Sequence, residues 1–198
     1  MSSEDNQESV HLVLRSGVTR ELFEETAAEL GLTKQGTWEP KGEKEAYEQV
    51  WTTPDMMRAI NYVEDPFTGM NYVHFRGSDL EELIEDFTDK LATYGPGELV
   101  ERAYTTDEHD EYVHNLYRLA ITFAEYDQEV FVIFENVATE APHPKLRLAA
   151  LDALAFRRWP QSRAVVERVG REDDDEGVKG AAQRLLTLWD APPPEQRT

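Results

Sequence analysis

LRLAALDAL, at residues 146–154, and VKGAAQRLL, at residues 178–186, share one apolar pattern that decides the architecture of this chain. Each segment places apolar residues at relative positions 0, 3, 4, 7 and 8, which lie on one face of an α-helix. Several of these residues are alanines, which let a neighbouring helix approach closely. A further helical pattern, at 162–171, lies between the two copies and follows Trp159 and Pro160. Helices that repeat at a period of 32 residues predict a helical solenoid.

A third copy of the pattern begins at Leu116, 30 residues before Leu146. A return helix is expected at 128–139, so that three helical units are predicted, the last of them a half pair. The segments HPKLRLAALDAL (143–154) and EGVKGAAQRLL (176–186) resemble the first helix of HEAT repeats, with an aliphatic–basic pair and small residues. The copy at Leu116 has Tyr117 where that motif has a basic residue. The resemblance concerns the C-terminal part of the chain only. It implies a HEAT-like array, a fold that mostly serves as a binding scaffold and includes a few enzymes.

The first half of the chain predicts a small antiparallel sheet with helices on one face. Strands are expected at 9–15, 46–53, 57–64 and 70–76, helices at 18–30 and 78–94, and a loop at 33–44. Ser78, with Glu81 three residues later, predicts a capping box at the start of the second helix. We therefore expect an α+β protein in four parts. They are a flexible tail at 1–8, an α+β domain at 9–97, HEAT-like helical repeats at 98–190 and a flexible tail at 191–198.

The composition excludes several classes of protein. The chain contains no cysteine, which rules out disulfide frameworks, cysteine-based zinc sites and thiol nucleophiles. Residues 1–8 are polar and acidic, unlike a signal peptide, and the apolar runs are far shorter than a membrane span. We therefore expect a bacterial-type cytoplasmic protein that makes no contact with a membrane.

The net charge of −20 is unevenly distributed. Residues 1–140 hold 31 acidic and 10 basic residues, whereas residues 141–198 hold 9 acidic and 10 basic residues. Such a balance argues against nucleic-acid binding, because the phosphates would be repelled. Solubility alone would account for the acidic excess, and the alternative is a surface that attracts a basic protein.

No pattern for catalysis or metal binding stands out. His109, Asp110 and His114 are near neighbours at a helix start, but a zinc site needs three protein ligands and an organised second shell. Acidic pairs such as Glu81 and Glu82 are too numerous for one to be chosen as a catalytic dyad. There is no Ser-His-Asp spacing and no phosphate-binding loop. We therefore expect no catalytic residues, no metal, no cofactor and no enzyme. The acidic run at 173–176 is interpreted as the cap of the last helix.

The leading hypothesis is a non-enzymatic protein-binding module, in which an inhibitor or immunity-like protein masks a basic partner. A surface with one sign of charge and no cleft would favour it. The alternative is an enzyme or small-ligand-binding protein with a pocket between the sheet domain and the helical array, which a deep pocket with buried polar groups would favour. The residues chosen for partner binding are Asp107, Glu108, Asp110, Glu111, Arg157 and Arg158.

Overall fold

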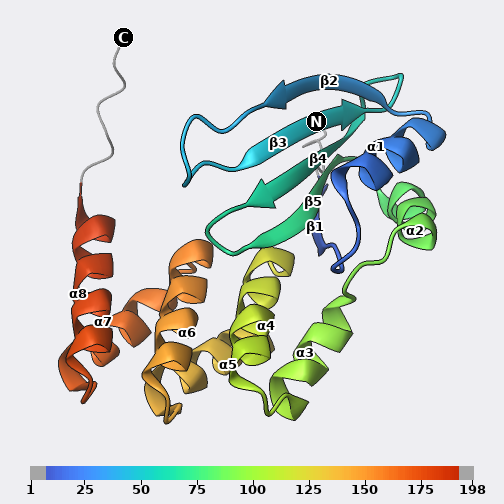
Figure 1. Ribbon diagram of the computed structural model, residues 1–198. Helices are drawn as coiled ribbons and strands as arrows, with labels where there is room; N and C mark the ends of the chain where they lie inside the picture. Colours follow the sequence, from blue (N-terminus) through green and yellow to red (C-terminus); the bar gives the residue numbers. More distant parts are fainter. Residues whose placement is uncertain (1–7, 192–198) are drawn as a thin grey trace, which may run out of the picture. The chain divides into compact units, whose positions relative to one another are not determined.

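The computed structural model describes residues 8–191 and has the predicted α+β class, with a five-stranded antiparallel sheet followed by helices (Figure 1). The described chain divides into two compact units. The sheet unit comprises residues 8–99 and 121–124, and the helical unit comprises residues 100–120 and 125–191. The two expected tails, at 1–8 and 191–198, lie outside the described residues except for Glu8 and Ala191.

The sheet unit contains five strands in the order β1-β5-β4-β3-β2, each antiparallel to its neighbours. The strands are β1 (Glu8–Val13), β2 (Thr33–Trp38), β3 (Tyr47–Thr52), β4 (Arg58–Asp65) and β5 (Met70–Gly77). The helices α1 (Arg20–Glu29) and α2 (Glu81–Lys90) cover one face of the sheet (Figure 1). Because strand side chains alternate between faces, this arrangement buries every second residue of the central strands beneath the helices.

Aromatic side chains form the core between the helices and the sheet. Phe23 of α1 stacks on Tyr62 of β4 with ring centroids 4.7 Å apart. Phe87 of α2 meets Phe75 of β5 edge to face at 5.2 Å. All four side chains are fully buried. Each such side chain contributes about 1.5–3 kcal/mol through burial, so these four fix both helices to the sheet.

Two local predictions for this unit were wrong. The expected loop at 33–44 begins with strand β2, which lacks an alternating apolar pattern because it is an exposed edge strand with a bulge between Lys34 and Gly36. Pairing with β3 holds it in place. The expected capping box at Ser78 does not form, since α2 begins at Glu81 and its N-cap Leu80 makes no side-chain capping bond. Asp79 has φ 53°, a left-handed conformation that turns the chain just before the helix.

The helical unit is built from the remaining helices. They are α3 (Pro96–Thr105), α4 (His109–Thr122), α5 (Gln128–Glu140), α6 (Pro144–Arg157), α7 (Ser162–Glu172) and α8 (Glu176–Asp190). The ends of α3 and α4 fall at the boundary with the sheet unit. Helices α4, α6 and α8 form one layer, and α5 and α7 form a second layer behind it (Figure 1).

The repeated apolar pattern is buried to different degrees along the array. All five pattern residues of α6, from Leu146 to Leu154, are buried. In α8 only Val178 and Ala182 are buried, because α8 packs against α6 and α7 on one side only. The third copy is cut short, since α4 ends at Thr122, before the last two positions of the pattern. The central copy is therefore the best packed.

Candidate functional site

Two of the four acidic residues predicted to bind a partner are engaged within the helical unit. Glu111 accepts hydrogen bonds from Arg102 and Arg118, each at 2.6 Å. Burial would raise the pKa of Glu111, but the two guanidinium groups together outweigh it and keep the pKa below the usual value. Asp110 pairs with Lys145, which lowers its pKa. Only Asp107 and Glu108 extend to solvent without an ion pair, and Glu108 also accepts a bond from the backbone of Glu111 at 2.7 Å.

The two predicted basic residues lie at the other end of α6. Arg158 caps its C-terminus with φ 49° and donates to the Trp189 carbonyl at 3.1 Å. The Arg157 guanidinium lies 4.5 Å from the ring centroid of Phe156. Lys145 and Arg157 are twelve positions apart in α6, which corresponds to about 18 Å along the helix. The structure therefore does not bring the predicted acidic and basic residues together into one site.

Four of the five histidines lie in two pairs. His109 and His143 lie at the starts of α4 and α6 with ring centroids 3.9 Å apart. On two neighbouring strands, His11 stacks on His74 at 4.0 Å. Within residues 8–191, no three or more His, Asp or Glu side chains are grouped so that they could hold a metal ion.

The acidic run at 173–176 has two structural tasks. Asp175 caps α8, as predicted, by accepting bonds from the backbone of Gly177 and Val178 at 2.9 and 3.0 Å. Asp173 instead forms a bidentate ion pair with Arg147 at 2.8 and 2.9 Å. The two side chains are 4% and 8% exposed, so this pair is nearly buried. It joins α6 to the turn that precedes α8.

A polar network lies under α1 in the sheet unit. Arg20 donates two hydrogen bonds to Glu64, at 2.9 and 2.8 Å, and its guanidinium lies 3.5 Å from the ring centroid of Tyr47. Tyr62 donates to Glu64 at 3.0 Å and accepts from Asn71 at 3.2 Å. The bonds from Arg20 lower the pKa of Glu64, whereas burial raises the pKa of Tyr62. The charged form of Glu64 is therefore favoured, and Arg20 supplies its counter-charge.

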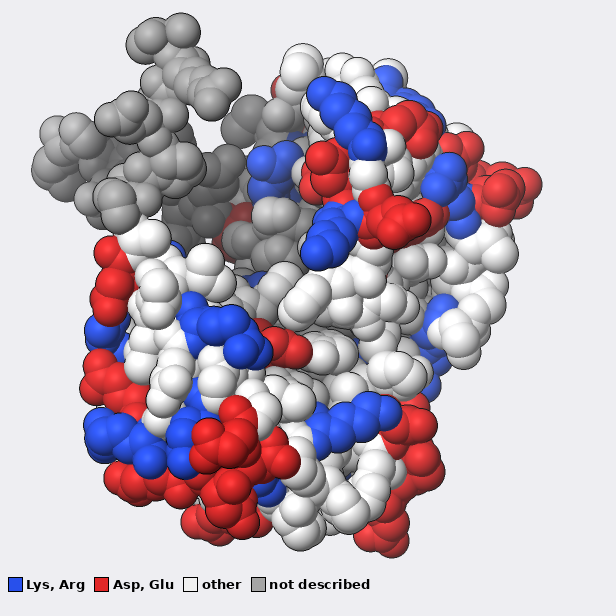
Figure 2. Space-filling model, turned by 60° about the vertical axis from the view of Figure 1, so that its left-hand side comes forward, with Lys and Arg blue, Asp and Glu red and all other residues white. Residues whose placement is uncertain are grey.

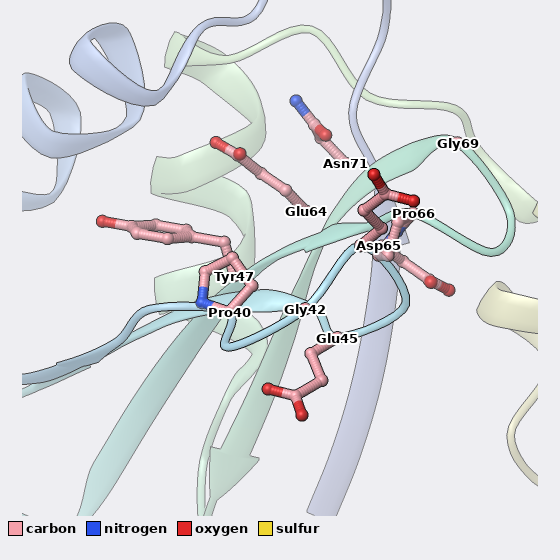
Figure 3. A pocket seen from close by; sticks show the side chains of 10 residues that line it. Pro40, Gly42, Glu45, Tyr47, Glu64, Asp65, Pro66, Gly69 and Asn71 are labelled. Carbon is pink, nitrogen blue, oxygen red and sulfur yellow. The ribbon is translucent and has the colours of Figure 1, made fainter.

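This network forms part of the wall of an open pocket of about 330 Å³. Tyr47, Glu64 and Asn71 face one another in register on adjacent strands, and Figure 3 shows Glu64 and Asn71 extending to the same side of the sheet. Four of its lining residues are acidic: Glu43, Glu45, Glu64 and Asp65. Most of its polar groups are satisfied internally. Asp65 accepts from Phe67 and Thr68, and Glu45 accepts from the backbone of Lys41. We assign these contacts to the stability of the sheet and its loops.

The strongest unbalanced charge of the sheet unit lies on α1 and α2. Residues 8–99 hold nineteen acidic and eight basic residues. Eight exposed carboxylates gather on these two helices. The helices are neighbours, as the ion pair between Lys90 of α2 and Glu29 of α1 at 2.9 Å shows. We call the eight carboxylates the α1–α2 acidic surface: Glu21, Glu25, Glu29, Glu81, Glu82, Glu85, Asp86 and Asp89. Among the described residues, Glu29 is the only member that forms an ion pair.

The helical unit distributes its charges differently. Residues 100–191 hold eighteen acidic and eleven basic residues, and many of them are paired. Figure 2 shows acidic and basic side chains lying next to one another over the end of this unit that α8 forms. Arg163, for example, binds both Glu167 and Asp190. Much of the charge in this unit is therefore paired locally, although acidic residues still outnumber basic ones.

The sequence-based choice of site residues did not include the α1–α2 acidic surface. In the sequence, Glu81 and Glu82 are one of many acidic pairs, and Glu81 also belongs to the predicted capping box. One available signal was the spacing in residues 81–89, where five acids lie on the side opposite the apolar stripe of Leu83, Phe87 and Leu91. Lys90 is the only basic residue in that helix. What the sequence does not reveal is which acids have a cation nearby, because those cations come from distant positions in the chain.

Among residues 8–191, no helix is long and apolar enough to cross a membrane. Comparison with known proteins gave no match: no family model fits the chain, and no curated protein or solved structure is significantly similar to it.

Proposed function

We propose that this chain is a non-enzymatic protein-binding module that masks a basic partner, in the manner of an inhibitor or immunity-like protein. The observation that carries the proposal is the α1–α2 acidic surface, with eight exposed carboxylates and one ion pair. Like charges crowded on adjacent helices repel one another, and a basic partner would relieve that repulsion. Complementary charge of this kind accelerates encounter and disfavours acidic competitors.

The helical unit would act as a HEAT-like scaffold within the same protein. Its two layers of helices and the repeated small residues of α6 support this interpretation. The local pairing of many of its charges suits a structural role, while the unpaired acids of α1 and α2 suit recognition. A cysteine-free sequence is compatible with a reducing compartment such as the cytoplasm.

The test compares two acidic clusters on one protein. The full-length chain is used to isolate a partner from the source organism, and the association rate of the purified pair is followed by stopped-flow fluorescence at increasing salt. We expect the rate to fall steeply with salt while dissociation changes little, because screening acts mainly on encounter. The variant Glu85→Lys with Asp89→Lys should slow association by about tenfold.

The matched control carries the same change of charge at the cluster predicted from the sequence, as Asp107→Lys with Glu108→Lys. We expect a smaller effect there. An association rate that does not depend on salt, or a partner with an acidic binding surface, would overturn the proposal. A larger effect at Asp107 and Glu108 would move the binding surface to the helical unit.

A further inference from the structure

Two adjacent methionines are presented to solvent on the turn between β3 and β4. Met56 is 70% exposed and Met57 is 62% exposed, among the most exposed large apolar side chains of the described residues. Methionine side chains are flexible and polarisable, and they are over-used where a protein surface has to adapt to a partner. Two neighbours so exposed form an apolar tip on this turn.

The turn that carries these side chains is held by its own hydrogen bonds. Asp55 accepts from the backbone of Met57 at 3.0 Å and from the Thr53 hydroxyl. The backbone of Arg58 donates to the same hydroxyl at 3.1 Å, and its carbonyl accepts from the backbone of Thr53 at 3.0 Å. Met56 adopts φ 61°, a conformation that costs energy for a residue with a side chain. The tip is thus ordered before any partner binds, which reduces the entropy lost on binding.

The methionine turn is pressed against the chain segment that leads into α2. A Cβ atom at Gly77 would lie 2.4 Å from the Met57 carbonyl oxygen, and Gly77 itself has φ 140°. Only glycine fits this close approach, which fixes the turn beside the end of β5. An open pocket of about 330 Å³ lies next to it. The pocket is lined by Arg58, Asp79, Glu81, Glu82 and Glu85, so that four of its five lining residues are acidic.

We infer that Met56, Met57 and this pocket form one docking surface for a basic amphipathic segment of a partner protein. The apolar side of such a segment would cover the methionines. Its Lys or Arg side chains would meet Glu81, Glu82 and Glu85, which belong to the α1–α2 acidic surface. The inference rests on the proposed function and adds the chemistry of the segment that is recognised.

The probe is a synthetic helical peptide of leucine and lysine, with its leucines on one face. A second peptide has the same composition in scrambled order, so that it keeps the charge and loses the apolar face. Both are labelled and titrated with the full-length chain, and fluorescence anisotropy measures the dissociation constant. The amphipathic peptide should bind at least about tenfold more tightly than the scrambled one, since only it can bury the methionines.

Three variants separate the apolar from the charged contribution. Met56→Ser with Met57→Ser should weaken binding of the amphipathic peptide by about tenfold. Binding of the scrambled peptide should not change. The triple variant Glu81→Gln, Glu82→Gln and Glu85→Gln should weaken binding of both peptides. It should also make the dissociation constants less dependent on salt. Leu188→Ser, which removes an apolar side chain that is also 70% exposed but lies on α8, should change neither. Thermal unfolding of each variant verifies that the fold is kept.

The outcomes of this experiment are distinct. Equal binding of the two peptides, or no effect of the methionine substitutions, would overturn the docking surface and leave the proposed function standing if the glutamine variant still binds more weakly. Loss of binding through Leu188→Ser would overturn it as well, by moving the contact to α8. If neither peptide binds and the purified partner associates at a rate independent of salt, the proposed function itself fails.

Discussion

Carboxylates of the helical unit and carboxylates of the α1–α2 acidic surface differ in whether a cation of the same unit pairs with them. Asp173 and Glu111 meet arginines of their own unit at hydrogen-bonding distance. Within the α1–α2 acidic surface, seven of the eight acids form no ion pair with a described residue. The same residue type therefore stabilises the fold in one region and remains available for an external cation in the other. What distinguishes the two regions is whether a cation lies within reach of each acid, more than the density of acids in the sequence.

Removing the anion of the buried pair should give the largest loss of stability among these tests of the contrast. Asp173→Asn leaves Arg147 buried without its main counter-ion, and we expect a loss of about 3 kcal/mol in the free energy of unfolding. Asp174→Asn is the matched control, because the Asp174 side chain is 96% exposed although it also approaches Arg147. Urea unfolding measures both. A loss of equal size in the two variants would contradict a structural role specific to Asp173.

The same pair predicts a dependence on pH. Burial acts to raise the pKa of Asp173, yet Arg147 and the backbone of Asp175 lower it on balance. A group whose pKa is lowered by folding adds stability above its unfolded pKa, about 3.9, and loses it as the pH falls through the folded value. The difference in stability between the unmodified chain and Asp173→Asn should therefore shrink in acid.

An intermediate effect is expected in the sheet unit. Glu64→Gln keeps an acceptor for Tyr62 but removes the charge that Arg20 binds. Because the side chains of Arg20 and Glu64 are 36% and 31% exposed, water compensates in part, and we expect a loss of about 1 kcal/mol. Glu25→Gln, on the exposed side of α1, serves as the control and should be near neutral. A neutral Glu64→Gln would show that the polar network is dispensable for stability.

A small effect of opposite sign is expected at Asp152. This half-buried carboxylate of α6 accepts a hydrogen bond from Tyr117 at 3.1 Å, and burial raises its pKa. A raised pKa means that ionisation at neutral pH works against folding. Asp152→Asn keeps an acceptor for Tyr117 and removes that cost, so we expect a gain below about 1 kcal/mol at neutral pH. The gain should vanish in acid, and thermal unfolding at the two pH values measures it.

The smallest effect on folding is expected on the α1–α2 acidic surface. Glu85→Gln with Asp86→Asn should change the free energy of unfolding by no more than about 0.5 kcal/mol, because neither residue forms an ion pair in the described chain. Any change should be stabilising, since repulsion between neighbouring acids falls. A marked loss of stability would show that these residues hold the fold, and the contrast between the two regions would then disappear.

Much of the fold could be predicted from the sequence because its signals are local. The apolar pattern at 146–154 and the break at Trp159 and Pro160 are each contained in a short stretch of sequence. Helices α6 and α7 accordingly lie where they were expected. Strand β2 was missed because an exposed edge strand has no apolar alternation and exists through its pairing with β3. The capping box at Ser78 failed because Asp79 turns left-handed before α2 begins. Local propensity cannot anticipate either of these tertiary effects.

The site was harder to predict for the same reason. Asp110 and Glu111 looked available in the sequence, yet their cations come from α6, α3 and a later turn of α4. The acids of α2 resemble ordinary helix-start residues in the sequence, and none of them forms an ion pair with a described cation. The docking surface depends on Gly77 meeting Met57, twenty residues earlier in the chain. Each of these relations requires the three-dimensional arrangement.

The bulge in β2 has a consequence for self-association of the chain. An edge strand exposes backbone groups that can pair with a second copy and start an aggregate. Between Lys34 and Gly36 the bulge interrupts the regular spacing that such pairing needs. The indole of Trp38 also folds back over Gly36, where an added Cβ would lie only 3.1 Å from the ring. A bulged edge of this kind should disfavour pairing of β2 with the same strand of a second copy.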